Sequence, residues 1–458
     1  MEHTERPVAD LVVKNATVVT AHTTFTGGLA VEGEFCVALG ANHALPAARE
    51  TIDATGLHLL PGFVEVHAHF REPGMSQKED WDTGSRAAAA GGFTTIFDMP
   101  NCIPPTADVD TFQEKMELAQ GRAMVDYGLY GAVIDNNVSQ LPRLAEAGAI
   151  GFKLFMAETV GKVPCPPDHI IFDAFRAIAR TGLPVGVHAE NDPILQFLVR
   201  EYKAQGRKDP RAHEDSRPIM IEDEAVGRAI AIAAGAGNRL HIYHLSTIEA
   251  LERVREAKAK GLPVTAEVLV SHLLLCLEEH GHLGTLIKLN PPVRTQEHRA
   301  AMWGGLRRGW LDNIAADHAP HAPEEKLQDD VWEAGAGWGG LETNLPLMLT
   351  QVHQGKLTLS QLVFWYSENP ARMWSVYPRK GCLGIGSDAD FILVDFYKER
   401  RIDAKRFYSK AKFSPFDGWA VRGSVEKVFL RGRLICDGGR VRGEPWGRMV
   451  RPNGSARG

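Results

Sequence analysis

The sequence lacks long hydrophobic runs, and its cysteines form no paired motif. No apolar stretch is long enough to span a bilayer, and the first six residues lack the apolar core of a signal peptide. The six cysteines are scattered along the chain without a C-x-x-C pair, which is typical of reduced thiols. We therefore expect a cytoplasmic protein with no membrane partner.

A large excess of either charge is also missing. The chain has 51 lysines and arginines and 57 acidic residues, and its net charge of −6 argues against a nucleic-acid or anionic-membrane partner. Its hydrophobic content of 44% and charged content of 24% are typical of soluble globular proteins. Since 458 residues exceed a usual single domain, we expect one large barrel and a smaller unit.

The first part of the chain predicts strands and no helix. Residues 10–14, 16–20 and 35–39 are rich in β-branched or apolar residues, and Gly27-Gly28 predicts a turn between strands. Such a run of short strands is typical of one half of a small β domain placed before the barrel.

From residue 59 the pattern changes to a repeated unit of strand, Gly- or Ala-rich loop and helix. Eight such strands predict a (β/α)8 TIM-like barrel, an α/β fold. A capping box at 246–249 and Gly261 bound one of the helices. The alternative is a doubly wound open sheet, but no G-x-G-x-x-G follows the first strand. The predicted strands are 62–67, 94–99, 126–132, 150–155, 184–188, 240–244, 263–268 and 313–317.

The end of the chain returns to β structure. A helical stretch at 357–373 is broken at Pro370, strands are expected at 391–395 and 425–431, and the Gly- and Ser-rich tail 451–458 is expected to be unstructured. The predicted division is a β segment (1–58), a barrel (59–378) and a second β segment with its tail (379–458).

Two histidines end the first barrel strand. An apolar run leads into His67 and His69, and the two-residue period of a strand points both side chains to the same face. Together they make a rigid pair of metal ligands, because imidazole suits zinc and similar divalent ions. For this pair alone, the alternative is one loop histidine and one that is satisfied by hydrogen bonds.

Further polar side chains end other strands, where (β/α)8 enzymes carry their chemistry. Lys153 lies inside the apolar fourth strand, where an ammonium must find a partner or lose its charge. A neutral amine can add carbon dioxide to give a carbamate, which can bridge two metals. The alternative is a lysine paired with a carboxylate. The set that converges on one rim comprises His67, His69, Asn101, Lys153, His188, His244, Glu267, His272 and Asp317.

Six motifs occupy these strand ends and the adjoining loops. They are Pro61-Gly-Phe-Val-Glu-Val-His-Ala-His-Phe-Arg-Glu-Pro-Gly74, Asp98-Met-Pro-Asn101, Gly151-Phe-Lys-Leu-Phe155, Val187-His-Ala-Glu190, Lys288-Leu-Asn-Pro-Pro-Val-Arg294 and Ala316-Asp-His-Ala-Pro-His321. Together they resemble the cyclic amidases of the amidohydrolase superfamily: dihydroorotase, allantoinase, hydantoinase and dihydropyrimidinase. The resemblance covers nearly the whole chain and implies that the two terminal β segments join into one small β-sandwich domain.

The resemblance also implies a centre of two divalent ions, expected to be Zn²⁺, in which Lys153 carries a bridging carbamate. A hydroxide between the ions would attack the ring amide, and Asp317 would pass its proton to the departing nitrogen. The implied ligands are His67, His69 and Asp317 for one ion and His188 and His244 for the other.

Within this group the sequence is most similar to dihydroorotase, which interconverts dihydroorotate and N-carbamoyl-L-aspartate in pyrimidine biosynthesis. Arg71 is placed to clamp a substrate carboxylate, although its spacing equally allows an ion pair with Glu72 or Glu79. Thr159 matches a loop position that closes over substrate, or it belongs to an ordinary polar turn. The implied substrate contacts are Arg71, Asn101, Asn290 and His321.

Three features depart from the dihydroorotase pattern. Cys102 stands where that family has Thr, Val270-Ser271-His272 replaces Pro-His-His, and 216–222 resembles allantoinases and hydantoinases. The alternatives are therefore allantoinase, or hydantoinase and dihydropyrimidinase, ring opening. A non-catalytic amidohydrolase-like partner protein is a third class, which keeps the barrel but loses the ligands. We expect a small cyclic amide as the binding partner and a homo-oligomer, either dimer or tetramer.

Overall fold

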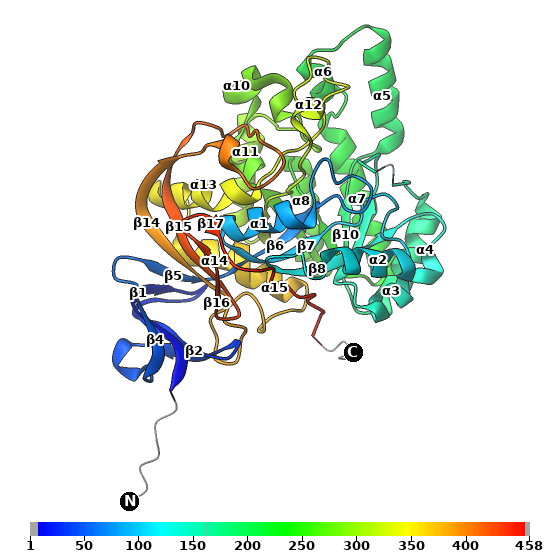
Figure 1. The fold of residues 1–458 in the computed structure, drawn as a ribbon. Helices are drawn as coiled ribbons and strands as arrows, with labels where there is room; N and C mark the ends of the chain where they lie inside the picture. Colours follow the sequence, from blue (N-terminus) through cyan, green and yellow to red (C-terminus); the bar gives the residue numbers. More distant parts are fainter. Residues whose placement is uncertain (1–7, 162, 454–458) are drawn as a thin grey trace, which may run out of the picture.

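The computed structural model describes residues 8–161 and 163–453. These residues form an eight-stranded parallel barrel wrapped by helices and a nine-stranded sheet built from both ends of the chain (Figure 1). In Figure 1 the blue N-terminal strands lie beside the orange C-terminal strands, away from the green helices α5 and α6. The predicted fold class is confirmed. Residues 454–458 of the predicted unstructured tail lie outside the described residues.

The barrel strands are buried runs that pair in parallel, in sequence order. The His69 N–H donates to the His318 carbonyl at 2.8 Å, and the His318 N–H donates to the His67 carbonyl at 3.1 Å, which closes the barrel. The strand ends lie within two residues of the predicted ones. The strands are β6 (Phe63–Ala68), β7 (Phe93–Asp98), β8 (Asp126–Val133), β9 (Gly151–Phe155), β10 (Val185–His188), β11 (Leu240–Ile242), β12 (Val264–Leu269) and β13 (Asn313–Ala315).

Capping residues set where the barrel helices begin. Thr247 accepts a hydrogen bond from the Ala250 N–H at the start of α8 (Ile248–Ala259). The predicted cap at Ser246 is one residue too early, because the hydroxyl and N–H of Ser246 both bind Glu222. The other helices around the barrel are α1 (Trp81–Gly91), α2 (Val109–Ala119), α3 (Leu141–Ala147), α4 (Asp168–Ala179), α5 (Asp192–Ala204), α6 (Pro210–Asp215), α7 (Ile219–Ala236), α9 (Val270–Leu274), α10 (Leu277–His280), α11 (Gln296–Arg307), α12 (Pro323–Lys326) and α13 (Leu341–His353).

The predicted break at Pro370 does not occur. A π-helical turn, Phe364–Glu368, connects α14 (Leu359–Val363) to α15 (Asn369–Met373). Pro370 is the second residue of α15 and follows this π-helical turn directly, in which the Asn369 N–H donates to the Phe364 carbonyl five residues earlier. The helical path therefore continues through the proline.

The terminal sheet has the strand order β17-β16-β15-β14-β5-β1-β2-β3, with β4 also paired to β1. The antiparallel pairing of β5 with β14 joins the two ends of the chain into one sheet. The predicted turn at Gly27-Gly28 is wrong, because both glycines lie inside β2. The strands are β1 (Ala9–Val19), β2 (Thr24–Glu32), β3 (Phe35–Gly40), β4 (Ala48–Asp53), β5 (His58–Pro61), β14 (Phe391–Arg401), β15 (Ala420–Leu430), β16 (Arg433–Asp437) and β17 (Arg440–Val441).

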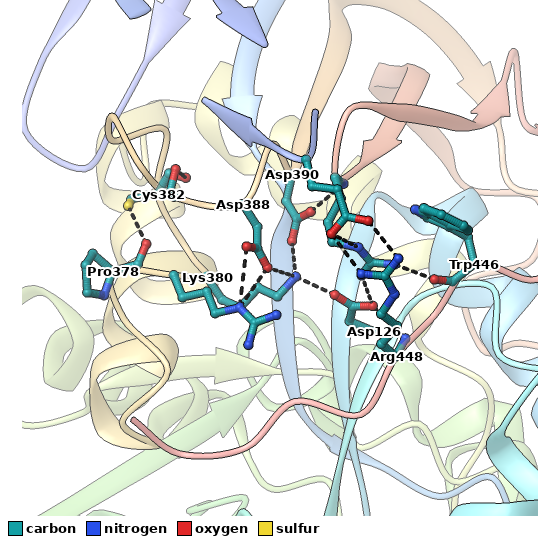
Figure 2. Close-up of polar contacts among 12 residues, drawn as sticks. Asp126, Pro378, Lys380, Cys382, Asp388, Asp390, Trp446 and Arg448 are labelled. Carbon is teal, nitrogen blue, oxygen red and sulfur yellow. Dashed lines mark hydrogen bonds and ion pairs between the residues drawn. The ribbon is translucent and has the colours of Figure 1, made fainter. Parts of the chain in front are cut away.

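A buried ion cluster joins the sheet to the N-terminal end of the barrel (Figure 2). The Lys380 ammonium lies 2.5 Å from Asp126 at the start of β8, 2.7 Å from Asp390 and 2.9 Å from Asp388. Arg431 adds a second cation on Asp126. The chain division predicted at residues 58 and 378 stays a prediction. None of the helices in the described ranges is both long and apolar enough to cross a membrane.

Candidate metal centre

Nearly all the predicted site residues surround one cavity at the C-terminal end of the barrel. His67 lies at the end of β6, Lys153 within β9 and His188 at the end of β10. The remaining members lie in the turns that follow the strands. The predicted residues that line this cavity are His67, His69, Arg71, Asn101, Lys153, Thr159, His188, His244, Asn290 and Asp317.

The local backbone turns three of these side chains into position. Arg71, His244 and Asp317 have φ values of 64°, 40° and 43°, in the left-handed region that non-glycine residues rarely adopt. Each follows the last residue of a barrel strand by two or three positions. Strained backbone of this kind is maintained only where the surrounding structure imposes it, and it gathers at functional sites.

Imidazole nitrogens and one carboxylate form the inner surface of the cavity. Asp317 Oδ1 lies 3.2 Å from His67 Nε2 and 3.1 Å from His69 Nε2. His67, His244 and Asp317 each offer a ligand atom within 4.8 Å of the others. His188 Nδ1 lies 2.9 Å from His244 Nε2. These atoms are the kind of donor set that zinc and similar divalent ions prefer.

Oxygen acceptors among the described residues hold three of the four rings. His67 Nδ1 lies 2.5 Å from Glu267 Oε1, and His69 Nδ1 lies 2.7 Å from Asn101 Oδ1. His188 is held in the same way by Glu190. Each oxygen accepts a hydrogen bond from the N–H of one ring nitrogen, so the other nitrogen presents its lone pair to the cavity.

The protonation states of the buried histidines and of Asp317 suit the binding of a cation. Burial lowers the pKa of His69 to about 3 and that of His244 well below its ordinary value, so both rings are neutral. Burial alone would raise the pKa of Asp317, but His67 and His69 lower it well below its ordinary value. Neutral imidazoles beside an ionised carboxylate fit a divalent ion.

Lys153 is buried without a hydrogen-bond partner within the described part of the chain. Its Nζ lies 3.6 Å from the centre of the Tyr243 ring, and burial lowers its pKa to about 7. The alternative of an ion pair with a carboxylate is not observed in residues 8–161 and 163–453. An orphaned amine of low pKa fits the nucleophile that carbamate formation requires.

Arg71 also faces the cavity with unused donors. Its side chain is buried, and Nε and Nη1 have no hydrogen-bond partner among the described residues. The predicted alternative partners are engaged elsewhere, since Glu72 pairs with Arg122 and Glu79 with His318. Burial lowers the pKa of Arg71 to about 10, so the guanidinium remains charged at neutral pH. It can bind an acceptor group on a ligand.

The other predicted contacts differ in how freely they face the cavity. The carbonyl of the Asn101 side chain is occupied by His69, and its amide donates to the Val160 carbonyl at 3.2 Å. Asn290 Oδ1 lies 2.8 Å from His213 Nε2. Thr159 lies in the wall beside Glu158. These residues form the rim of the site.

His321 and His272 do not line the cavity. His321 Nε2 lies 3.1 Å from the carbonyl of Ala336, a wall residue, and its Nδ1 lies 3.1 Å from Lys78 Nζ. His321 therefore supports the wall instead of facing a ligand. His272 Nε2 lies 3.2 Å from the carbonyl of Pro291, the residue after Asn290.

The sequence did not reveal which residues support the ligands. Glu267 was placed at a strand end without a partner, whereas the structure pairs it with His67. Glu190 lies two residues after His188, and this spacing was the signal that could have marked it. Nothing in the sequence indicates that the Tyr243 ring packs against Lys153, although its neighbour His244 is a predicted ligand.

Comparison with known proteins is consistent with this geometry. Residues 58–435 match the model of the amidohydrolase family. The chain is 37% identical to an L-hydantoinase of Paenarthrobacter aurescens over 94% of this chain and 95% of that protein. It is 37% identical to an allantoinase of Rubrobacter xylanophilus over 97% and 98%. The structure of an L-hydantoinase (dihydropyrimidinase) from Arthrobacter aurescens has a TM-score of 0.94 at 36% identity, covering 97% of this chain and all of that one. These relatives favour the hydantoinase or allantoinase alternative over the predicted dihydroorotase.

Proposed function

The chain belongs to the amidohydrolase family, and from that premise we propose that it hydrolyses a ring amide of a cyclic ureide of the hydantoin or allantoin type. The observation that carries the proposal is the convergence of four histidines, Lys153 and Asp317 on one cavity. Relatives named for hydantoin and allantoin that match nearly the full chain support this substrate class.

The cavity residues would hold two divalent ions, with Zn²⁺ as the first choice for imidazole ligands. The buried amine of Lys153, which has no hydrogen-bond partner in the part of the chain that the structure describes, would enter the site as a carbamate and bridge them. Such ions polarise a carbonyl and lower the pKa of water, so that hydrolysis proceeds at neutral pH. The proposed ligands are His67, His69 and Asp317 for one ion and His188 and His244 for the other.

Asp317 is placed to move the proton of the reaction. Its carboxylate is ionised because neighbouring histidines lower its pKa, so it can accept a proton from the attacking water. When the amide C–N bond breaks, the ring nitrogen becomes the terminal nitrogen of a carbamoyl group and needs that proton back, which Asp317 can deliver from the same position. Asp317 would thus act as both ligand and proton carrier.

Arg71 supports a second candidate, the ring of dihydroorotate. This ring carries a carboxylate outside the amide. A guanidinium suits such a group when two of its donors, as here, have no partner in the described residues. The same donors can bind the carbonyl of a ureido substituent, as in allantoin. Arg71 therefore favours a substrate with an acceptor group beside the ring.

A panel of substrates tests the proposal. Protein loaded with Zn²⁺ and bicarbonate is offered allantoin, a 5-substituted hydantoin, dihydrouracil and dihydroorotate, and ring opening is followed by the loss of ring absorbance. We expect the highest kcat/KM for allantoin or the hydantoin. Fastest turnover of dihydroorotate would instead support the second candidate. Two bound ions without turnover of any ring would contradict the cyclic-ureide proposal.

Two further expectations belong to the proposal. The protein is expected to be cytoplasmic and to assemble as a dimer or tetramer. Cell fractionation checks the first expectation, and light scattering of the purified protein checks the second.

A further inference from the structure

His188 is held from behind by a buried chain of two charged residues. Glu190 Oε2 lies 2.8 Å from His188 Nε2, and Glu190 Oε1 lies 3.3 Å from Arg217 Nε. Glu190 is 1% exposed and Arg217 is 8% exposed. Burial of these charges is unfavourable unless each one is compensated by a partner.

The contact between Glu190 and Arg217 is an ion pair and not a well-aligned hydrogen bond. Glu190 Oε1 and Arg217 Nε make no hydrogen bond of good geometry with any described residue, although they lie at ion-pair distance. An ion pair of this kind tolerates a change of geometry that keeps the positive charge. A lysine at position 217 should therefore replace much of the arginine's effect.

Other residues fix Arg217 independently of its side chain. Arg217 lies in the turn between α6 and α7, and its carbonyl accepts a 2.6 Å hydrogen bond from Arg294 Nη1. Arg294 in turn pairs with Glu222 at 3.3 Å. The turn is thus anchored through its backbone, and the guanidinium contacts Glu190 through Nε and the Ser216 hydroxyl through Nη1, each at 3.3 Å.

The two halves of the proposed metal centre are supported unequally. Glu267, which holds His67, also accepts from the backbone N–H of His244 at 3.2 Å and lies 3.4 Å from His241. Glu190 holds His188 with Arg217 as its counter-charge, and His244 Nδ1 has no partner in the described ranges. Besides its contact with His244, the other proposed ligand of this ion, the His188 ring is held by Glu190.

We propose that Glu190, fixed by Arg217, is the positioning residue for His188, and that the ion held by His188 and His244 depends on this pair. The inference rests on the proposed two-ion centre. Carboxylates that orient a metal-binding histidine change metal affinity about 10- to 100-fold when they are removed. Among the described residues, no hydrogen bond or ion pair joins Glu190 or Arg217 to the proposed ligands of the other ion, His67, His69 and Asp317.

Zinc binding to the full-length protein tests the inference. Zn²⁺ bound per chain is measured by elemental analysis after dialysis against buffered free Zn²⁺, for wild type, Glu190→Gln, Arg217→Met and Arg217→Lys. We expect Glu190→Gln and Arg217→Met to bind one of two ions about 10- to 100-fold more weakly. Arg217→Lys should retain both ions. The visible spectrum of the Co²⁺-loaded proteins reports the same change at the altered ion.

Glu222→Gln is the matched control. Glu222 is a buried carboxylate of the same network, bound to Ser246 and Arg294, and it contacts none of the site histidines. It should bind both ions as wild type does, even if its thermal stability falls. Equal loss of one ion in Glu190→Gln and Glu222→Gln would overturn the positioning role, as would two unweakened ions in Glu190→Gln. A wild-type protein that binds no pair of ions would instead overturn the proposed metal centre.

Discussion

Two lysines, Lys153 and Lys380, lie fully buried at opposite ends of the barrel, and their surroundings differ completely. Burial alone would lower the pKa of Lys380, but Asp126, Asp390 and Asp388 raise it above its ordinary value. Lys153 has no such partner among residues 8–161 and 163–453, and burial lowers its pKa to about 7. A buried charge that its neighbours satisfy holds the fold together, whereas a buried polar atom left unsatisfied is ready for a ligand.

The comparison is tested most strongly at the cavity. Lys153→Met should lower kcat/KM on the order of a thousandfold, because the several kcal/mol that bound ions supply would be lost with their bridging ligand. The unfolding free energy of the metal-free protein should not fall, since no hydrogen bond of Lys153 is removed. Turnover, bound Zn²⁺ and urea denaturation measure these effects. Two tightly bound ions in the variant would contradict the bridging role.

The opposite pattern is expected at the base of the barrel. Lys380→Met should lower the unfolding free energy by about 3–5 kcal/mol, because it leaves buried carboxylates without their cation. Turnover per folded molecule should stay within about twofold of wild type, since the cluster lies far from the cavity residues. Arg379→Gln is the control. Arg379 pairs with the same Asp388 but is half exposed, so its loss should change stability by at most about 1 kcal/mol. A large loss of turnover in folded Lys380→Met would contradict the distinction between a structural Lys380 and a functional Lys153.

Arg71 sharpens the comparison within the cavity. Arg71→Met should lower kcat/KM about 10- to 100-fold, the effect of about 1.5–3 kcal/mol for hydrogen bonds to a charged group. Zn²⁺ content should not change, because Arg71 Nε and Nη1 make no hydrogen bond to a proposed ligand in the described residues. Arg122→Met is the control, since Arg122 pairs with Glu72 outside the cavity. Unchanged kinetics in Arg71→Met would show that its free donors do not reach the substrate.

The sequence could predict the features that follow from local pattern. Buried apolar runs between turn residues located all eight barrel strands, because strand length and hydrophobicity are local properties. The rule that strand ends carry the chemistry of a barrel then placed His67, His188 and Asp317 together. Because all the strands of a barrel end at the same face, the ligands could be predicted without any knowledge of their contacts.

Features that depend on distant neighbours were missed. A glycine pair usually marks a turn, but a Cβ at Gly28 would lie 1.7 Å from the Val13 carbonyl, so glycine is needed there for close approach of β1 and β2. Ser246 looks like a helix cap, yet its hydroxyl is taken by Glu222. His321 binds the Ala336 carbonyl only because of the path of the loop between them. No local pattern encodes these tertiary contacts.

The smallest effect is expected at an ion pair of intermediate exposure. Glu325 lies 2.5 Å from Lys78, and its side chain is 31% exposed. His321 and Lys78 lower the pKa of Glu325 to about 2, below its ordinary value of 4.5. The pair therefore stabilises the fold above pH 4.5, and this contribution is lost as the pH falls through about 2. Solvent screening limits it to at most about 1 kcal/mol.

The difference in unfolding free energy between metal-free wild type and Glu325→Gln should thus be largest near neutral pH and shrink on acidification. A difference that grows toward low pH would contradict this sign, and one as large as that of Lys380→Met would mean that exposure does not separate the two kinds of pair.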